Sequence, residues 1–140
     1  NTNFFTLGPR VDYRAMEWLT LTLTYLYERG LADGHKDTQF ADDVSYYLHM
    51  VSAGTEVRIN RQWDLGFTYI HRRKTFTSGL AGDTHVGRFD ATHQGIAELR
   101  YHMSAAATVM LSFQYGKRTS TNALRDFQDS ILSIGGQYRF

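Results

Sequence analysis

The chain has 140 residues, and its 15 Lys and Arg against 14 Asp and Glu give a net charge of +1. That balance argues against a nucleic-acid partner, and the absence of cysteine excludes disulfides, CxxC zinc sites and thiol catalysis. No run of about 18 apolar residues is present, so the sequence holds no candidate for a membrane-spanning helix.

Apolar and polar residues alternate along most of the chain with the period of two that is typical of β-strands. The segment 18–29 is the clearest, because leucine and tyrosine occupy one face and threonine occupies most of the other. In the segment 44–59 the alternation changes phase after Met50, which predicts either a bulge or a covered strand end. Seven strands are predicted in total, at 3–14, 18–29, 44–59, 63–76, 92–102, 105–118 and 127–140.

The connections between these strands alternate in length. Tight turns are expected at 15–17, 60–62 and 103–104, and long polar loops at 31–43, 78–91 and 119–126. Short turns at one end and long loops at the other are typical of a transmembrane β-barrel. The sequence therefore predicts an all-β, antiparallel, up-and-down barrel segment that occupies the single domain 1–140.

Aromatic residues gather near both ends of the apolar faces, with Leu, Val and Ala between them. Such girdles are typical of membrane–water boundaries, and they favour an apolar face that contacts lipid. A water-soluble barrel would place the apolar face inside and the polar face outside. The polar face here is rich in Thr, Ser, Gly and Gln, so it cannot form a dry core. The predicted girdle residues are Tyr13, Tyr25, Tyr27, Trp63, Tyr69, Tyr101, Phe113 and Tyr115.

Charged residues on the opposite, polar face are candidates for lining a lumen. They either tune the passage of ions or solutes, or form a ladder of cross-strand salt bridges that fixes the register. Four of the arginines, at 14, 58, 100 and 139, stand before a short turn or the last residue and predict a positive arc at one mouth. The candidate lumen-lining residues are Arg10, Asp12, Arg14, Glu56, Arg58, Asp64, Arg72, Glu98, Arg100 and Arg139.

Seven is an odd number of strands, whereas bacterial barrels of this class have an even number. Because an open sheet would leave unpaired edges in lipid, we expect the chain to be the C-terminal part of a larger barrel or one piece of a multi-chain barrel. An eight-stranded barrel with one unrecognised strand is the alternative.

The last residues fit the pattern polar-x-Gly-x-x-aromatic-x-aromatic, carried by Ser133, Gly135, Tyr138 and Phe140. This pattern resembles the C-terminal assembly signal of Gram-negative outer-membrane β-barrels. The resemblance implies a location in the outer membrane and recognition by the barrel-assembly machinery. It also implies contact with membrane lipid and lipopolysaccharide, and pairing with the remaining strands of a barrel.

Arginine-bearing strands and the segment Trp63–Tyr69 are similar to two porin-like groups. One is the sleeve barrel around a multihaem cytochrome, and the other is associated with exopolysaccharide export. Two functions follow as alternatives: a pore or transport conduit, or a structural sleeve that encloses a periplasmic or lumenal protein.

Motifs for chemistry are absent from the sequence. HExxH, CxxCH and GxSxG do not occur, so we expect no metal, no cofactor and no enzymatic activity. The one group of residue types suited to hydrolysis shares a single loop and consists of Ser78, Asp83, His85 and Asp90.

Overall fold

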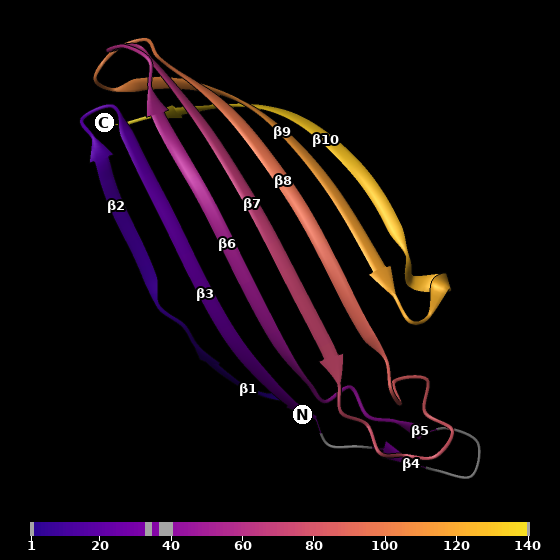
Figure 1. Cartoon of the computed structure of the whole chain (residues 1–140). Helices are drawn as coiled ribbons and strands as arrows, with labels where there is room; N and C mark the ends of the chain where they lie inside the picture. The colour runs from indigo at the N-terminus through magenta and orange to yellow at the C-terminus, as the bar shows by residue number, and fades with distance from the viewer. Residues whose placement is uncertain (1, 33–34, 37–40, 140) are drawn as a thin grey trace.

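One curved antiparallel sheet makes up most of the protein (Figure 1), in a computed structural model that describes residues 2–32, 35–36 and 41–139. The sheet has eight strands in the order β1-β3-β6-β7-β8-β9-β10, with β2 also paired to β3. Its strands are β1 (Thr2–Leu7), β2 (Arg10–Met16), β3 (Leu19–Ala32), β6 (Tyr46–Arg58), β7 (Trp63–Phe76), β8 (Phe89–His102), β9 (Ala107–Ser120) and β10 (Phe127–Tyr138). A two-residue pair, β4 (His35–Lys36) with β5 (Ala41–Asp42), and a 3-10 turn, η1 (Ala123–Arg125), lie in the long loops. The prediction of an all-β antiparallel fold is confirmed.

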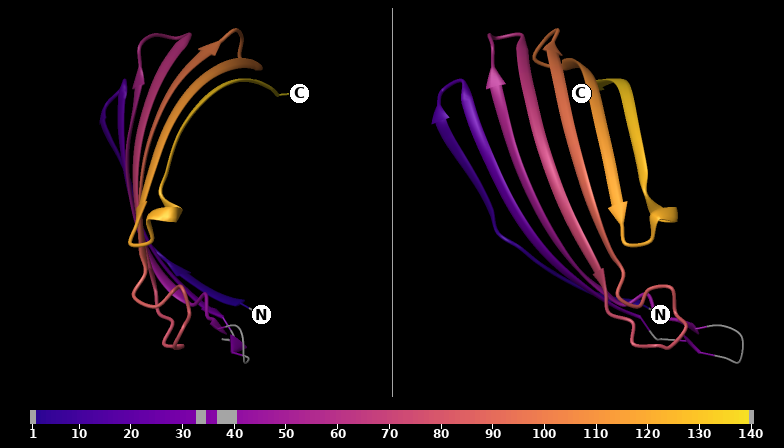
Figure 2. Two further views of the ribbon diagram at one scale, coloured as in Figure 1. Left: turned by 90° about the vertical axis from the view of Figure 1, so that its right-hand side faces the viewer. Right: turned by 45° about the vertical axis from the view of Figure 1, so that its right-hand side comes forward.

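The sheet is open rather than closed. Figure 2 shows a trough-like shell in which the short turns gather at one end and the long loops at the other. Strand β10 pairs only with β9, and β1 and β2 pair only with β3, so two edges remain unpaired within the described residues.

The first predicted strand, 3–14, is divided in two at Gly8 and Pro9, and the prediction of seven strands was wrong for this reason. Both halves keep one register against β3, because Leu7 pairs with Tyr27 and Arg10 pairs with Thr24. Proline has no N–H to donate to the ladder, and only its carbonyl bonds to the N–H of Tyr25, at 3.0 Å. A single edge strand is thus interrupted without being displaced.

Strand β6 shows no bulge. Its register is continuous from Tyr46 onward against both β3 and β7, so the bulge predicted near Met50 is absent. Tyr46, Leu48 and Met50 instead share the face of Glu56, where they are half-buried. The change of phase in the sequence marks apolar residues at the long-loop end of the polar face.

The two faces of the sheet differ in exposure. Along β9, Leu111, Phe113 and Tyr115 are exposed, while the residues between them are half-buried or buried. The side chains of a curved sheet diverge on its convex side and converge on its concave side, so the apolar face is the convex one. Phe76 is the only apolar side chain that is buried among the described residues, which means that neither face is packed against a second layer. The described residues include no helix long and apolar enough to cross a membrane.

Candidate functional site

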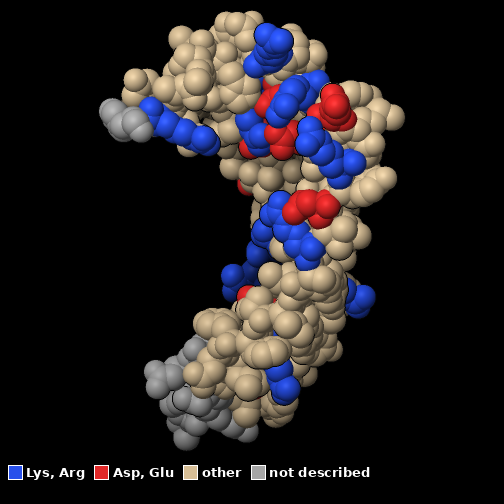
Figure 3. Space-filling view, turned by 90° about the vertical axis from the view of Figure 1, so that its left-hand side faces the viewer, with Lys and Arg blue, Asp and Glu red and all other residues tan. Residues whose placement is uncertain are grey.

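The ten charged residues proposed to line a lumen all lie on the concave face. Strand register places nine of them there, and alternation beyond Tyr138 places Arg139 on the same side. Seven of the ten form ion pairs: Arg10 with Asp12, Arg58 with Asp64, and Arg100 with both Glu56 and Glu98. Figure 3 shows acidic and basic side chains interspersed toward the short-turn end.

Arg100 is the centre of the largest cluster. Its guanidinium donates to Glu56 at 3.1 Å and to Glu98 at 2.8 Å, and so joins β6 and β8 across the intervening strand. The residue between the two acids in the same cross-strand row is Gly66, which has no side chain to block this contact. Such a bridge over one strand is possible only where side chains converge, which agrees with the concave curvature.

Asp64 is the centre of a second cluster. It pairs with Arg100 across β7 and β8, one row closer to the short turns than Glu56 and Glu98. Its side chain is 11% exposed and lies between Arg58, at 3.7 Å, and His102 Nε2, at 2.8 Å. The same ring bonds through Nδ1 to the hydroxyl of Thr108, so three adjacent strands and the end of β6 are joined. Asp64, His102 and Thr108 line a hollow of about 320 Å³ together with Arg139.

The four arginines of the predicted arc differ in their partners. Arg58 and Arg100 are paired with acids, whereas Arg14 donates only to the backbone oxygen of Glu17. Among the described residues, Arg14, Arg72 and Arg139 are the concave-face arginines of the predicted set without an ion pair. Most of the ten charged residues therefore take part in salt bridges, and a role of the others in the passage of ions or solutes stays a prediction.

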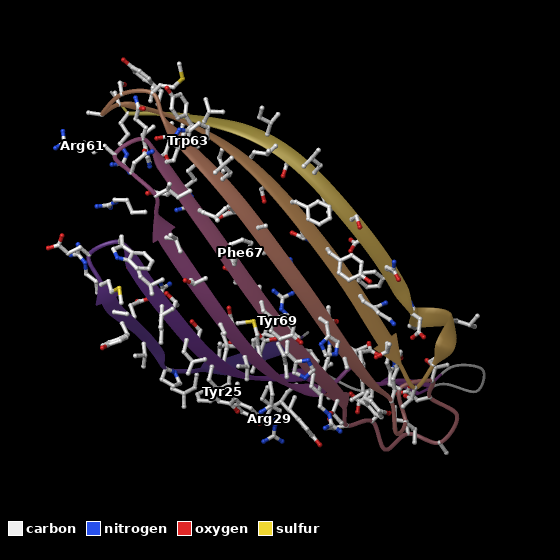
Figure 4. The ribbon with its side chains drawn as sticks, turned by 45° about the horizontal axis from the view of Figure 1, so that its top comes forward. Tyr25, Arg29, Arg61, Trp63, Phe67 and Tyr69 are labelled. Atoms are coloured by element: carbon white, nitrogen blue, oxygen red, sulfur yellow. The ribbon has the colours of Figure 1, made fainter. Side chains whose placement is uncertain are left out.

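The convex face carries all of the predicted girdle residues. Tyr69 shares a cross-strand row with Tyr115, and Trp63 stacks on Tyr101 with ring centroids 4.6 Å apart. Figure 4 shows Trp63, Phe67 and Tyr69 in succession along β7. Most side chains between the two aromatic ends are aliphatic, and Leu65, Leu99 and Leu111 form one row among them.

Residues of the predicted assembly pattern lie on both faces of β10. Ser133 and Gly135 pair with Ser112 and Met110 on the concave face, while Tyr138 is convex and 62% exposed. Phe140 lies outside the described residues.

Sequence analysis did not identify a row of histidines on the convex face beyond the long-loop aromatic residues. The Tyr25 hydroxyl lies 2.7 Å from His49 Nδ1, and the Tyr69 hydroxyl lies 2.6 Å from His93 Nδ1. His71 stacks on His93, with ring centroids 4.6 Å apart. The signal was present in the alternation, because His71 and His93 share the phase of the apolar, convex positions on their strands.

The residues suited to hydrolysis do not form a nucleophile–base pair. Ser78 donates its hydroxyl to Asp83, and His85 contacts the other oxygen of that carboxylate, so the aspartate separates serine from histidine. Asp83 also accepts the backbone N–H groups of His85 and Asp43, and its side chain is 1% exposed. Asp90 is absent from this group and pairs with Arg88. The loop is therefore held to the segment before β6 by one buried carboxylate.

We expect Asp83→Asn to open this loop. Burial raises the pKa of Asp83, but the hydrogen bonds from Ser78, His85 and Asp43 outweigh it and hold the pKa well below its usual range. A group with a lowered folded pKa stabilises the fold above its unfolded pKa, and that stability is lost only as the pH falls through the folded value. The parent loop should thus stay protected from proteolysis from neutral pH down to about pH 4. In the Asp83→Asn variant, the side-chain amide cannot accept all four hydrogen bonds that the carboxylate accepts.

Limited proteolysis between residues 77 and 88, at pH 7 and pH 4, measures the effect. The Asp83→Asn variant should be cut faster than the parent at both pH values. Asp126→Asn, which lies in another long loop, is the control. Cleavage of the parent that rises steeply between pH 7 and pH 5 would contradict this account.

The described residues include no cluster of three or more His, Asp or Glu side chains arranged to hold a metal ion. Comparisons of the chain with protein-family models, with curated proteins and with solved structures gave no match.

Proposed function

We propose that this chain forms part of the wall of an outer-membrane β-barrel whose concave face lines a pore or transport conduit. The observation that carries the proposal is the division of a single-layer sheet into an apolar convex face with aromatic ends and a polar, charged concave face. In water, such a convex face would leave large side chains exposed, among them Leu132 at 71% and Ile134 at 78%. In lipid, the same exposure is stabilising.

The open edges also support a larger assembly. Backbone groups at the edge of a sheet have no water to bond to inside a bilayer, so every spanning strand needs two neighbours. The free edges of β10 and of β1–β2 are therefore expected to pair with further strands, from the same or another chain. In the closed barrel, the ion pairs of Arg100 and Asp64 would fix the wall, and the unpaired arginines would face the solute.

We expect the triple variant Arg14→Gln, Arg72→Gln and Arg139→Gln to shift the selectivity of the pore toward cations, because it removes three cations from the concave face. The reversal potential of single channels of the full-length protein in planar bilayers, under a salt gradient, measures the shift. Arg29→Gln, Arg73→Gln and Lys117→Gln together remove the same charge from the convex face, and this control should leave the reversal potential unchanged. Equal shifts in both triple variants would contradict the assignment of the faces. Negligible conductance in every variant would contradict an open pore and favour a sleeve around a partner protein.

A further inference from the structure

Carboxylates in the main sheet are confined to one of its two faces, whereas cations occur on both. Seven carboxylates lie at paired strand positions, and strand register places all seven on the concave side: Asp12, Glu28, Glu56, Asp64, Asp90, Glu98 and Asp129. The paired convex positions carry three cations, Arg29, Arg73 and Lys117, all exposed. The convex cations therefore have no carboxylate neighbour on their own face in the described sheet, and their charge is available to an anion from outside.

These cations adjoin the three convex histidines. His49 pairs with Arg73, His71 pairs with His93, and His93 pairs with Lys117. Because neighbouring strands are about 4.8 Å apart, the patch is continuous over β6, β7, β8 and β9. Arg29 on β3 pairs with Tyr47, the convex neighbour of His49 on β6, and so extends the patch to β3. We call the patch the basic collar, and its members are Arg29, His49, His71, Arg73, His93 and Lys117.

The tyrosine hydroxyls orient two rings of the collar. When Tyr25 and Tyr69 donate to Nδ1 of His49 and His93, the ring proton lies on Nε2, which is then a donor. Nδ1 of His71 is buried and has no hydrogen-bond partner. The collar thus presents N–H donors and full positive charges together, a combination suited to phosphate oxygens.

An apolar groove leads directly from the collar toward the middle of the convex face. It encloses about 550 Å³, and its walls are Phe67 and Tyr69 on β7 and Phe113 and Tyr115 on β9. The floor is β8, where Gly95 and Ala97 leave the space open, and a Cβ added at Gly95 would meet no atom within 4 Å. The walls stand about 10 Å apart, two strand spacings, which is wide enough for an acyl chain. Because Tyr69 bonds His93, the aromatic wall ends at the collar.

We propose that the basic collar and the aromatic groove together bind one phosphorylated lipid, with a phosphate on the collar and an acyl chain in the groove. This inference rests on the proposed function. Outer-membrane barrels have short periplasmic turns and longer extracellular loops, so the long-loop end of the proposed barrel would lie at the outer leaflet, where the phosphorylated lipid is lipopolysaccharide. Juxtamembrane basic residues contribute about 1 kcal/mol each toward anionic lipid, and aromatic walls bury the chain.

The test measures binding of bisphosphorylated lipid A to the full-length protein in detergent micelles, by native mass spectrometry. The collar variant Arg29→Gln, Arg73→Gln and Lys117→Gln should bind at least about 10-fold more weakly, since each cation is worth nearly one decade. The concave variant Arg14→Gln, Arg72→Gln and Arg139→Gln removes equal charge and should bind as the parent does. Gly95→Leu, which fills the groove floor, should also weaken binding. Unaltered sheet content by circular dichroism confirms that each variant is folded.

Equal losses in both triple variants would overturn the proposal, because binding would then follow net charge alone. Parent-like binding by the collar variant or by Gly95→Leu would overturn it as well. Inorganic phosphate at the same concentration should not displace lipid A, and complete displacement would reduce the site to a phosphate site without a lipid groove. Because binding in micelles requires no bilayer insertion, loss of insertion with retained lipid binding would contradict the proposed function and leave the lipid site standing.

Discussion

Leu111→Arg is expected to lower the free energy of unfolding in lipid vesicles by about 2–4 kcal/mol, the cost of an arginine at the lipid-facing midplane of a barrel. Leu111 lies in the convex row between Leu99 and Ile134, and it is 42% exposed. Neither neighbour offers a carboxylate, so an arginine there would have to carry its charge into hydrocarbon or bend toward the interface.

The adjacent residue is the matched control. Ser112 is on the concave face between Glu98 and Ser133, where an arginine meets a carboxylate and, in a pore, water. Ser112→Arg should therefore cost much less than Leu111→Arg in the same urea titration of vesicle-embedded protein. Equal penalties at the two positions would mean that the convex face does not contact lipid.

Gly8→Ala should destabilise the pairing of β1 with β3 by on the order of 2 kcal/mol, in the range for backbone strain. A Cβ at this position would lie 2.0 Å from the backbone oxygen of Tyr25 and 2.7 Å from the Cα of Leu26. Because both obstacles are backbone atoms, no side-chain rotation relieves the clash, and the edge strand must move away from β3.

Gly135→Ala provides the comparison, since Gly135 lies on the opposite edge strand, β10, and its Cβ would meet nothing within 4 Å. This substitution should change stability little, or raise it by about 0.4–1 kcal/mol through the lower entropy of the unfolded chain. Hydrogen exchange of the β1 amides should accelerate in Gly8→Ala alone. Unchanged exchange there would show that the edge strand tolerates a side chain at its break.

Period-two alternation was enough to predict the faces of the sheet. The concave position of Arg100 and the convex position of Tyr69 follow from counting residues within one strand, because a strand turns each side chain to the opposite face of its neighbours. Contacts between strands were not predictable in this way. That Arg100 reaches Glu56 across β7 depends on register, on curvature and on the absence of a side chain at Gly66.

Local irregularities were also missed, for identifiable reasons. Apolar and polar residues keep alternating through Gly8 and Pro9 because the register is preserved. The break caused by the missing N–H of Pro9 therefore could not be detected from the apolar pattern. At Met50 the opposite error occurred, since a change in polarity suggested a bulge where the backbone is regular. The carboxylate of Asp83 bonds to the backbone of Asp43, 40 residues away, and no local pattern specifies a partner at that separation.

The distance between the two aromatic ends of β7 can be compared with the thickness of a bilayer's hydrocarbon layer. From Trp63 to Tyr69 the strand advances six residues, or about 20 Å before any tilt. A bilayer whose hydrocarbon is much thicker would cover the rows beyond Tyr69, where His71 and Arg73 would have to be dehydrated. In the proposed barrel the sheet would therefore match a thin membrane, and the bacterial outer membrane is thinner than average. Because the described sheet has no packed interior of its own, we expect the melting temperature and folding rate of the proposed barrel to depend on lipid chain length, as joint properties of polypeptide and bilayer.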